Sequence, residues 1–458
     1  MKRTTTALFV GLPMTLLASG CGDGDTTGTG APASARPTVS PPATESSTEV
    51  TEAPTVVTAP DSERIDLVDP VFSNPTSITN PLFPISDLAQ VIQLGTEADT
   101  TLRTEVTLLP ETRLVEWNGV EVETLVSQFT AFADGRVVEV AVDFFAQADD
   151  GSVWYFGEEV TNYVDGLIAN HDGTWLAGTD GPPGMIMPAD PKVGDVYRPE
   201  NIPGFVFEEV TVKAVDETAD GPRGQVSGAI LIQELLMDGL LEDKIFAPGY
   251  GEFYFAVPAE EEVVYMGIAV PADALSGSAP EELTTLLEMS NEVFEAAASA
   301  DWKAVGSSIE AMTAAWDTYS ANGPPPLVAA QMSGALDSLG ASADSKDSVA
   351  VRQGALDASQ AALDLSLQYR LPADVDLGRM DRWTRQVQVD VEANASGAVA
   401  GDVVALTALW DRVAHTLDST VAAPIDGAMV GLRRAIADGD LAAALTAAAA
   451  LQASVEAA

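Results

Sequence analysis

Two patterns of hydrophobic positions divide the chain. From about residue 61 to residue 275, apolar and polar residues alternate, as at residues 136–143 and 152–156. A period of two predicts half-buried antiparallel strands. Further strands are expected at residues 207–215, 225–233, 251–257 and 262–270. From residue 278 to residue 458, apolar residues recur every three or four positions, which predicts an α-helical domain after the β domain.

Asn-Gly and Asp-Gly pairs separate the expected strands. Such pairs are favoured in hairpin turns, because glycine tolerates a positive φ and Asn or Asp can share it. The pairs are Asn118-Gly119, Asp134-Gly135, Asp150-Gly151, Asp165-Gly166 and Asp172-Gly173. Strands joined in order by short turns form an antiparallel meander, which can curl into a half-barrel or a barrel or fold into a sandwich. The sequence leaves these three forms open.

Proline and glycine mark the helix boundaries of the C-terminal region. Ser278 precedes Pro280, a second break falls at residues 322–326, and a third falls at Leu371-Pro372. The length between these breaks fits six to eight helices. We expect them to pack as an antiparallel bundle with short loops.

The helical region contains an internal repeat. Residues 311–317 align with residues 405–411, which places Trp316 and Trp410 about 94 positions apart. Two copies of a four-helix unit account for this offset. Tryptophans at helical spacing are more often packed in a core than exposed to a ligand, so we expect both rings to be buried.

The first 20 residues are typical of a secretory signal peptide. Lys2 and Arg3 precede a short apolar run over residues 7–17, and small residues then lead to Cys21. This ending resembles the signal of bacterial lipoproteins, although Ala18 stands where such signals usually have Leu. The resemblance implies cleavage before Cys21, acylation of Cys21 and anchoring in the membrane by its acyl chains.

Residues 21–60 are rich in Thr, Pro, Gly, Ser and Ala. A segment of this composition cannot bury a core, so we expect a disordered tether between the anchor and the β domain.

Several motifs in the β region resemble a family of uncharacterised bacterial proteins that are secreted or lipid-anchored. The motifs lie at residues 79–84 (TNPLFP), 150–158 (DGSVWYFGE), 185–188 (MIMP) and 246–251 (FAPGYG). The resemblance covers about residues 75–270 and implies no activity. Residues 85–88 depart from it, because the family usually continues there with a Gly-Thr-Trp-like strand. Residues 352–372 and 376–386 resemble an Ala-rich helical module of secreted bacterial proteins, again without an activity.

Composition narrows the range of partners. The chain carries 22 Lys and Arg against 69 Asp and Glu, for a formal charge of −47. Such a chain has no basic surface for nucleic acid or for anionic lipid headgroups. Its single Cys excludes a disulfide within the chain.

The residue types needed for common active sites are scarce. His171 and His415 are the only histidines, and neither has a His or Cys at metal-ligand spacing. The sequence has no Gly-x-Ser-x-Gly motif and no phosphate-binding loop. Carboxylates remain, and the weak candidates for a cation site are Asp149, Asp150, Glu158 and Glu159, with a second acidic run at residues 260–262. A solvated acidic face explains such runs more often.

These observations predict a lipoprotein on the extracytoplasmic face of the cell membrane that acts as a non-catalytic binding or envelope-associated module. Its expected partners are the membrane, through Cys21, and an envelope protein or a small ligand, with no cofactor and no nucleic acid. One alternative is a carrier that holds an apolar or lipid ligand in the curved sheet. The least favoured alternative is an enzyme that uses paired carboxylates.

Overall fold

The structure is a computed structural model that describes residues 57–458. The expected signal peptide, Cys21 and most of the expected tether lie outside these residues. Of the tether, only residues 57–60 are described. The backbone N–H of Ala59 donates to Glu209, and the carbonyl oxygen of Ala59 accepts from Arg198, so the chain is held against the β domain before residue 61.

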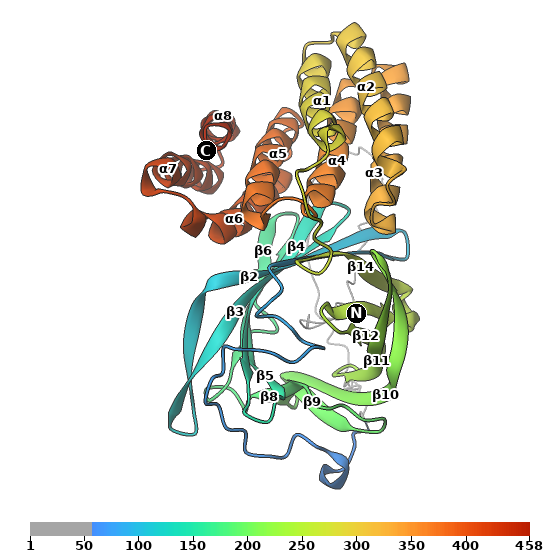
Figure 1. The fold of residues 1–458 in the computed structure, drawn as a ribbon. Coiled ribbons are helices and arrows are strands. Elements are labelled where there is room, and N and C mark those ends of the chain that lie inside the picture. Colours follow the sequence, from blue (N-terminus) through green and yellow to red (C-terminus); the bar gives the residue numbers. More distant parts are fainter. Residues whose placement is uncertain (1–56) are drawn as a thin grey trace, which may run out of the picture.

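The β region forms one antiparallel sheet of 14 strands (Figure 1). The strands are β1 Gln90–Glu97, β2 Thr100–Trp117, β3 Val120–Ala133, β4 Arg136–Gln147, β5 Val153–Val164, β6 Leu167–Asn170, β7 Trp175–Leu176, β8 Gly184–Met187, β9 Val196–Ile202, β10 Val206–Gly221, β11 Gly224–Leu236, β12 Leu241–Ala247, β13 Gly251–Val257 and β14 Glu262–Val270. Their hydrogen-bonded order is β6-β5-β4-β3-β2-β1-β14-β13-β12-β11-β10-β9, and β7 and β8 both pair with β5. The predicted strands at residues 251–257 and 262–270 are confirmed at both ends.

The sheet curls so that its two ends approach each other. β8 pairs with β5 near one end and lies against β9 at the other end. Gly184 in β8 is so close to Pro199 in β9 that an added Cβ would lie 1.8 Å from the Pro199 carbonyl oxygen. These contacts close the sheet through β8 into a form like a barrel, which is one of the three forms that the sequence leaves open.

The predicted turn residues have the backbone conformations that hairpins need. Asn118-Gly119, Asp134-Gly135 and Asp165-Gly166 all have positive φ at both positions, which matches the twist of the strands they join. Asp150-Gly151 lies in the longer loop between β4 and β5. Asp172-Gly173 was expected at a hairpin, but it joins β6 to β7, which both pair with β5 rather than with each other.

Eight α-helices follow the sheet within the described residues. They are α1 Glu281–Ala298, α2 Trp302–Ser320, α3 Pro326–Ser345, α4 Ser348–Ser366, α5 Pro372–Glu392, α6 Ser396–Val413, α7 Ser419–Ala437 and α8 Leu441–Glu456. Three short 3-10 helices lie at Asp61–Glu63, Pro258–Glu260 and Ala414–Thr416. The predicted boundaries are confirmed at Pro280, Pro326 and Pro372, because α1 begins directly after Pro280, and α3 and α5 begin with the other two prolines.

The helices pack as two groups of four. α1 contacts α2 and α4, and α3 contacts α4; in the same way α5 contacts α6 and α8, and α7 contacts α8. Figure 1 shows both groups at the same end of the curled sheet, joined where α4 meets α5. The packing pattern of the first group thus recurs in the second, which is what a duplicated four-helix unit requires.

The sheet and the helices share buried side chains. Ile92 of β1 and Ile268 of β14 belong to the core of α1–α4. Phe132 of β3 belongs to the core of α5–α8, where its ring stacks on Trp383 with centroids 6.0 Å apart. A third core fills the inside of the sheet. Separating the sheet from the helices would therefore expose apolar residues on both.

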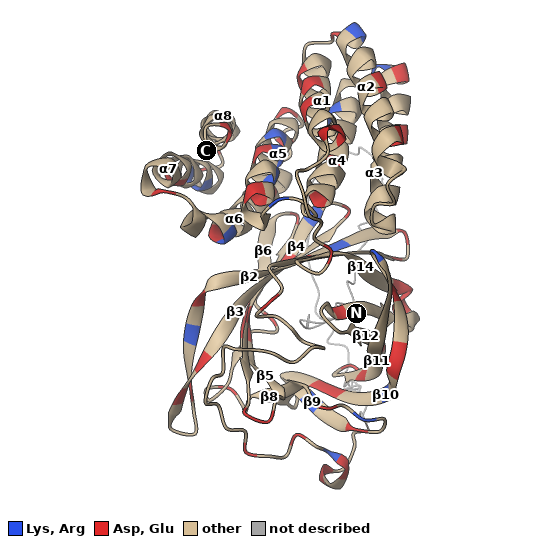
Figure 2. Cartoon of the chain, viewed as in Figure 1, with Lys and Arg blue, Asp and Glu red and all other residues tan. Residues whose placement is uncertain are grey.

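Acidic residues are spread over the sheet and the helices alike (Figure 2). No helix in residues 57–458 has the length and apolar content needed to cross a membrane.

Candidate functional site

A small apolar cavity lies inside the curled sheet, and its volume is about 70 Å³. Its walls come from β1, β2, β3, β12 and β13 and from the segment that precedes β1. The lining residues are Phe83, Pro84, Ile85, Leu88, Val91, Gln93, Val106, Leu108, Phe129, Phe246, Tyr250, Gly251 and Glu252. All are apolar except Gln93, Glu252 and the hydroxyl of Tyr250, which donates to Asp273 at 2.8 Å. The cavity therefore favours an apolar ligand with a polar group at one end.

The TNPLFP, DGSVWYFGE, MIMP and FAPGYG segments meet beside this cavity. Asn80 of the TNPLFP motif donates to the carbonyl oxygens of Gly151 and Pro188, at 3.1 and 2.9 Å, which joins three of the motifs. The N–H of Gly249, in the FAPGYG motif, donates to the Pro81 carbonyl oxygen at 2.8 Å. These hydrogen bonds fix the loop that places Phe83, Pro84 and Ile85 on the cavity wall.

Phe83 connects this loop to the core of the sheet. Its ring meets Phe145 edge-on with centroids 5.0 Å apart, and it lies 6.5 Å from the ring of Phe246. Aromatic contacts of this geometry add to the free energy of burial. The loop is therefore a packed part of the domain, and the cavity has a fixed wall.

Gln93 and Glu252 form the polar end of the cavity. Gln93 Nε2 donates to Glu252 Oε1 at 3.2 Å, while Gln93 Oε1 accepts from Thr104 at 2.8 Å. Glu252 Oε2 is buried and has no hydrogen-bond partner within residues 57–458. Burial raises the pKa of Glu252 to about 7, and Lys244 and Gln93 oppose that rise.

Lys244 is buried among carboxylates close to this polar end. It forms ion pairs with Glu234 and, at 3.1 Å, with Glu242. Burial favours the neutral amine, but Glu234, Glu242 and Glu208 outweigh it and raise the pKa of Lys244. Lys244 is thus a cation held by several acidic residues, and the surroundings of Glu252 contain more acidic than basic side chains.

A second group of carboxyls lies deeper in the sheet. Tyr155 donates to Asp143 at 2.9 Å, and Trp175 donates to Glu200 at 2.7 Å. Burial raises the pKa of Glu139 and of Glu200 to about 8, and it raises the pKa of Asp143 and Glu158 well above the usual range. These carboxyls therefore keep their protons to a higher pH than exposed carboxyls do, and none of them lines the apolar cavity.

Two of the strands that line the cavity, β1 and β2, carry the helical region on their opposite face. Side chains alternate along a strand, so Val91 and Gln93 of β1 point inward while Gln90 points toward the helices. In β2, Val106 points inward while Glu105 points outward. One wall of the cavity is thus also the docking surface of α4, α5 and α6.

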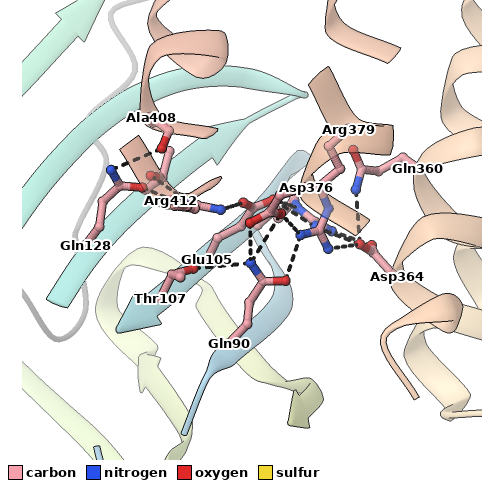
Figure 3. A network of polar contacts seen from close by, with 12 residues as sticks. Gln90, Glu105, Thr107, Gln128, Gln360, Asp364, Asp376, Arg379, Ala408 and Arg412 are labelled. Carbon is pink, nitrogen blue, oxygen red and sulfur yellow. Dashed lines mark hydrogen bonds and ion pairs between the residues drawn. The ribbon is translucent and has the colours of Figure 1, made fainter. Parts of the chain in front are cut away.

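Buried ion pairs hold this docking surface (Figure 3). Arg379 of α5 donates to Gln90 at 2.7 Å, to Asp376 at 2.6 Å and to Asp364 of α4 at 2.7 Å. Arg103 of β2 forms a two-bonded pair with Asp364, at 2.6 and 2.9 Å.

Arg412 extends the same network from α6. It donates to Glu105 at 2.6 Å, to Gln128 at 2.6 Å and to Thr130 at 3.1 Å. Burial alone would raise the pKa of Glu105, but Arg103, Arg379 and Arg412 hold it well below its usual range. The arginines of the network thus pair with its acids, although Arg379 Nε has no hydrogen-bond partner among the described residues.

The structure does not bring the predicted cation candidates together. Asp149 accepts from Ser73 and Asp150 accepts from Ser152, both in the region of the β4–β5 loop. Glu158 is fully buried inside the sheet, whereas Glu159 points outward and pairs with Arg113. No group of three or more His, Cys, Asp or Glu in the described part of the chain has a geometry that could hold a metal ion.

The acidic run at residues 260–262 and the two histidines lie elsewhere. Glu262 is buried in β14, and burial raises its pKa to about 9. His171 contacts the Val160 carbonyl oxygen at 2.8 Å, and His415 lies in the short helix after α6. Neither histidine lines the cavity.

Sequence reasoning did not identify Gln93, Lys244 or Glu252. The sequence held one signal for such residues, which is a charged residue at a strand position that faces the core. In β12, Glu242, Lys244 and Phe246 alternate with more exposed residues, so all three face the core.

Compared with known proteins, the chain matches no family model and no curated protein.

Proposed function

We propose that the protein is an extracytoplasmic lipoprotein that binds a small, mainly apolar molecule in the cavity of its curled sheet. The observation that carries this proposal is the apolar cavity between β1–β3 and β12–β13, walled by the loop that the TNPLFP and FAPGYG motifs fix. This proposal combines two of the alternatives raised by the sequence, the binding module and the carrier of an apolar ligand.

An exposed aromatic patch would favour recognition of a macromolecule instead. The most exposed aromatic side chains within residues 57–458 are Phe205, between β9 and β10, and Tyr265 in β14. Strands β11, β12 and β13 lie between them in the sheet, so the two rings do not form one patch. The cavity is the better candidate.

The size of the cavity limits the ligand. A cavity of about 150 Å³ holds benzene, so a volume of about 70 Å³ limits the enclosed part of a ligand to a few non-hydrogen atoms. A ceiling of about 1.5 kcal/mol per atom limits such a small ligand to about micromolar affinity at best. A long acyl chain does not fit within this volume.

Titration of the full chain with 1-pentanol, followed by calorimetry and by chemical shifts of the cavity methyl groups, tests the proposal. We expect saturable binding that the variant Val106→Phe abolishes, because Val106 lines the cavity and the larger side chain fills it. Val120→Phe is the matched control, since Val120 is 62% exposed in β3. Absence of binding, or equal binding by Val106→Phe when its circular dichroism is unchanged, would contradict the proposal.

A further inference from the structure

The cavity has one buried acceptor that the protein itself does not satisfy. Glu252 Oε2 has no donor within the described residues, although Glu252 Oε1 accepts from Gln93 at 3.2 Å. The rest of the wall is apolar apart from Gln93 and the tyrosine hydroxyl, which already has a partner in Asp273. A buried acceptor without a partner is unfavourable, so a ligand with a hydrogen-bond donor at this end would be stabilised there.

The charges behind Glu252 select among possible donors. Lys244 is the basic group near it, and that ammonium is already bound by Glu234 and Glu242. Glu234, which already pairs with Lys244, adds a negative charge near Glu252. No residue that lines the cavity is basic, so the carboxylate of Glu252 favours a cation over a neutral group and disfavours an anion.

The geometry points to a ligand with a primary ammonium group at Glu252 and a short apolar tail between Phe83, Leu88 and Phe246. This inference rests on the proposed function, because it names the class of ligand for the same cavity. The ammonium donates to Glu252 Oε2, and the tail replaces water against the apolar wall. The volume encloses only the first few carbons of this tail.

The test compares three ligands of equal length with the full chain at pH 8: pentylamine, 1-pentanol and pentanoate. We expect pentylamine to bind about tenfold or more tightly than 1-pentanol, as a charge-assisted hydrogen bond does relative to a neutral one. Pentanoate should bind more weakly than either.

Glu252→Gln removes the charge and keeps the size of the side chain. We expect it to lower the affinity for pentylamine by about tenfold or more and to change the affinity for 1-pentanol by less than about threefold. Glu217→Gln is the matched control, because Glu217 is exposed on β10 and does not line the cavity. If Glu252→Gln does not fold, the comparison of the three ligands with the unmodified chain decides alone.

The outcomes separate the two proposals. If 1-pentanol binds as tightly as pentylamine, or if Glu252→Gln keeps the preference for the amine, the ligand class is wrong and the apolar binding function stands. If none of the three ligands binds, the proposed function is wrong and the ligand class falls with it.

Discussion

Trp316 of α2 and Trp410 of α6 make corresponding hydrogen bonds in the two helical groups. The indole N–H of Trp316 donates to Ser333 of α3 at 3.0 Å, and that of Trp410 donates to Asp426 of α7 at 2.7 Å. Each ring thus links the second helix of its group to the third. The rings are 7% and 5% exposed, which confirms the expectation that both are buried.

Replacing either tryptophan should lower the free energy of unfolding strongly. We expect Trp316→Ala and Trp410→Ala each to cost about 3–5 kcal/mol, because each leaves a cavity in the core of its helical group. Urea unfolding followed by circular dichroism measures the change. Leu371→Ala is the control, since Leu371 is 70% exposed and should be nearly neutral. Near-neutral tryptophan variants would show that these rings do not hold the helices together.

The sequence predicts best those elements whose apolar residues face the core and whose polar residues face solvent. β13 and β14 alternate regularly, and proline marks the start of α3 and α5, so these boundaries could be located from the residues alone. The sequence pattern does not reveal β1 and β2. These strands bury polar residues on both faces, such as Gln90 toward the helices and Gln93 toward the cavity. Apolar and polar residues therefore do not alternate clearly along them, and the period of two is lost.

The cavity and the buried carboxyls could not be predicted for a different reason. Glu139 and Asp143 share a predicted strand with valines, and the usual expectation places the charged residues in solvent. Their burial depends on how β4, β5 and β9 curl around one another, because Glu200 of β9 lies in the same interior as Glu158 of β5. Contacts between residues so far apart in the sequence leave no local signal.

The network between sheet and helices should be sensitive to loss of Arg379. We expect Arg379→Met to lower the free energy of unfolding by about 3–5 kcal/mol, because it leaves the fully buried Asp364 and Asp376 with fewer partners. Thermal and urea unfolding measure the loss.

Arg434→Met is the matched control for this prediction. Arg434 is 83% exposed and pairs only at the surface with Asp438, so its loss should cost about 0–1 kcal/mol. Equal effects of the two variants would show that the buried network does not secure the helices to the sheet.

A turn of the sheet rests directly on α6. Gly166, at the β5–β6 turn, has φ +73° and lies so close to α6 that an added Cβ would be 1.9 Å from the Gly397 carbonyl oxygen. Gly119, at the β2–β3 turn, has a similar φ of +76° and nothing within 4 Å of the same position.

Alanine at these two glycines separates backbone strain from contact with the helix. We expect Gly119→Ala to cost about 1–2 kcal/mol, from the left-handed backbone alone. Gly166→Ala should cost about 1–3 kcal/mol more, because the turn and α6 must move apart. Equal losses of stability in urea would argue against a tight contact between this turn and α6.

The proposed anchor makes a prediction about localisation. Cys21 is the only Cys of the chain, so Cys21→Ser removes the sole thiol that could be acylated. In a bacterial host, the variant should lose incorporation of labelled palmitate and either leave the membrane fraction or remain an uncleaved precursor. Thr26→Ser is the control in the same region. Identical labelling and fractionation of Cys21→Ser and the unmodified chain would exclude a lipid anchor at this residue.

The buried carboxyls predict that stability falls as the pH rises. Burial raises the pKa of Glu139 from its ordinary value of 4.5 to about 8, so the folded protein holds this proton where the unfolded chain has lost it. The stabilisation is complete below about pH 4.5 and is lost as the pH rises toward about 8, at about 1.4 kcal/mol per pH unit for one group.

Glu139→Gln should remove this part of the pH dependence, because the amide does not titrate. Both carboxyl oxygens of Glu139 are buried without a hydrogen-bond partner among the described residues, so the neutral amide replaces a neutral acid at low pH. The variant should differ little from the unmodified chain at pH 5 and be more stable by about 2–4 kcal/mol at pH 9, as measured by urea unfolding. Glu217→Gln, an exposed position on β10, should show no such gain. A constant difference between Glu139→Gln and the unmodified chain from pH 5 to pH 9 would mean that Glu139 is not the proton-binding group inferred from its burial.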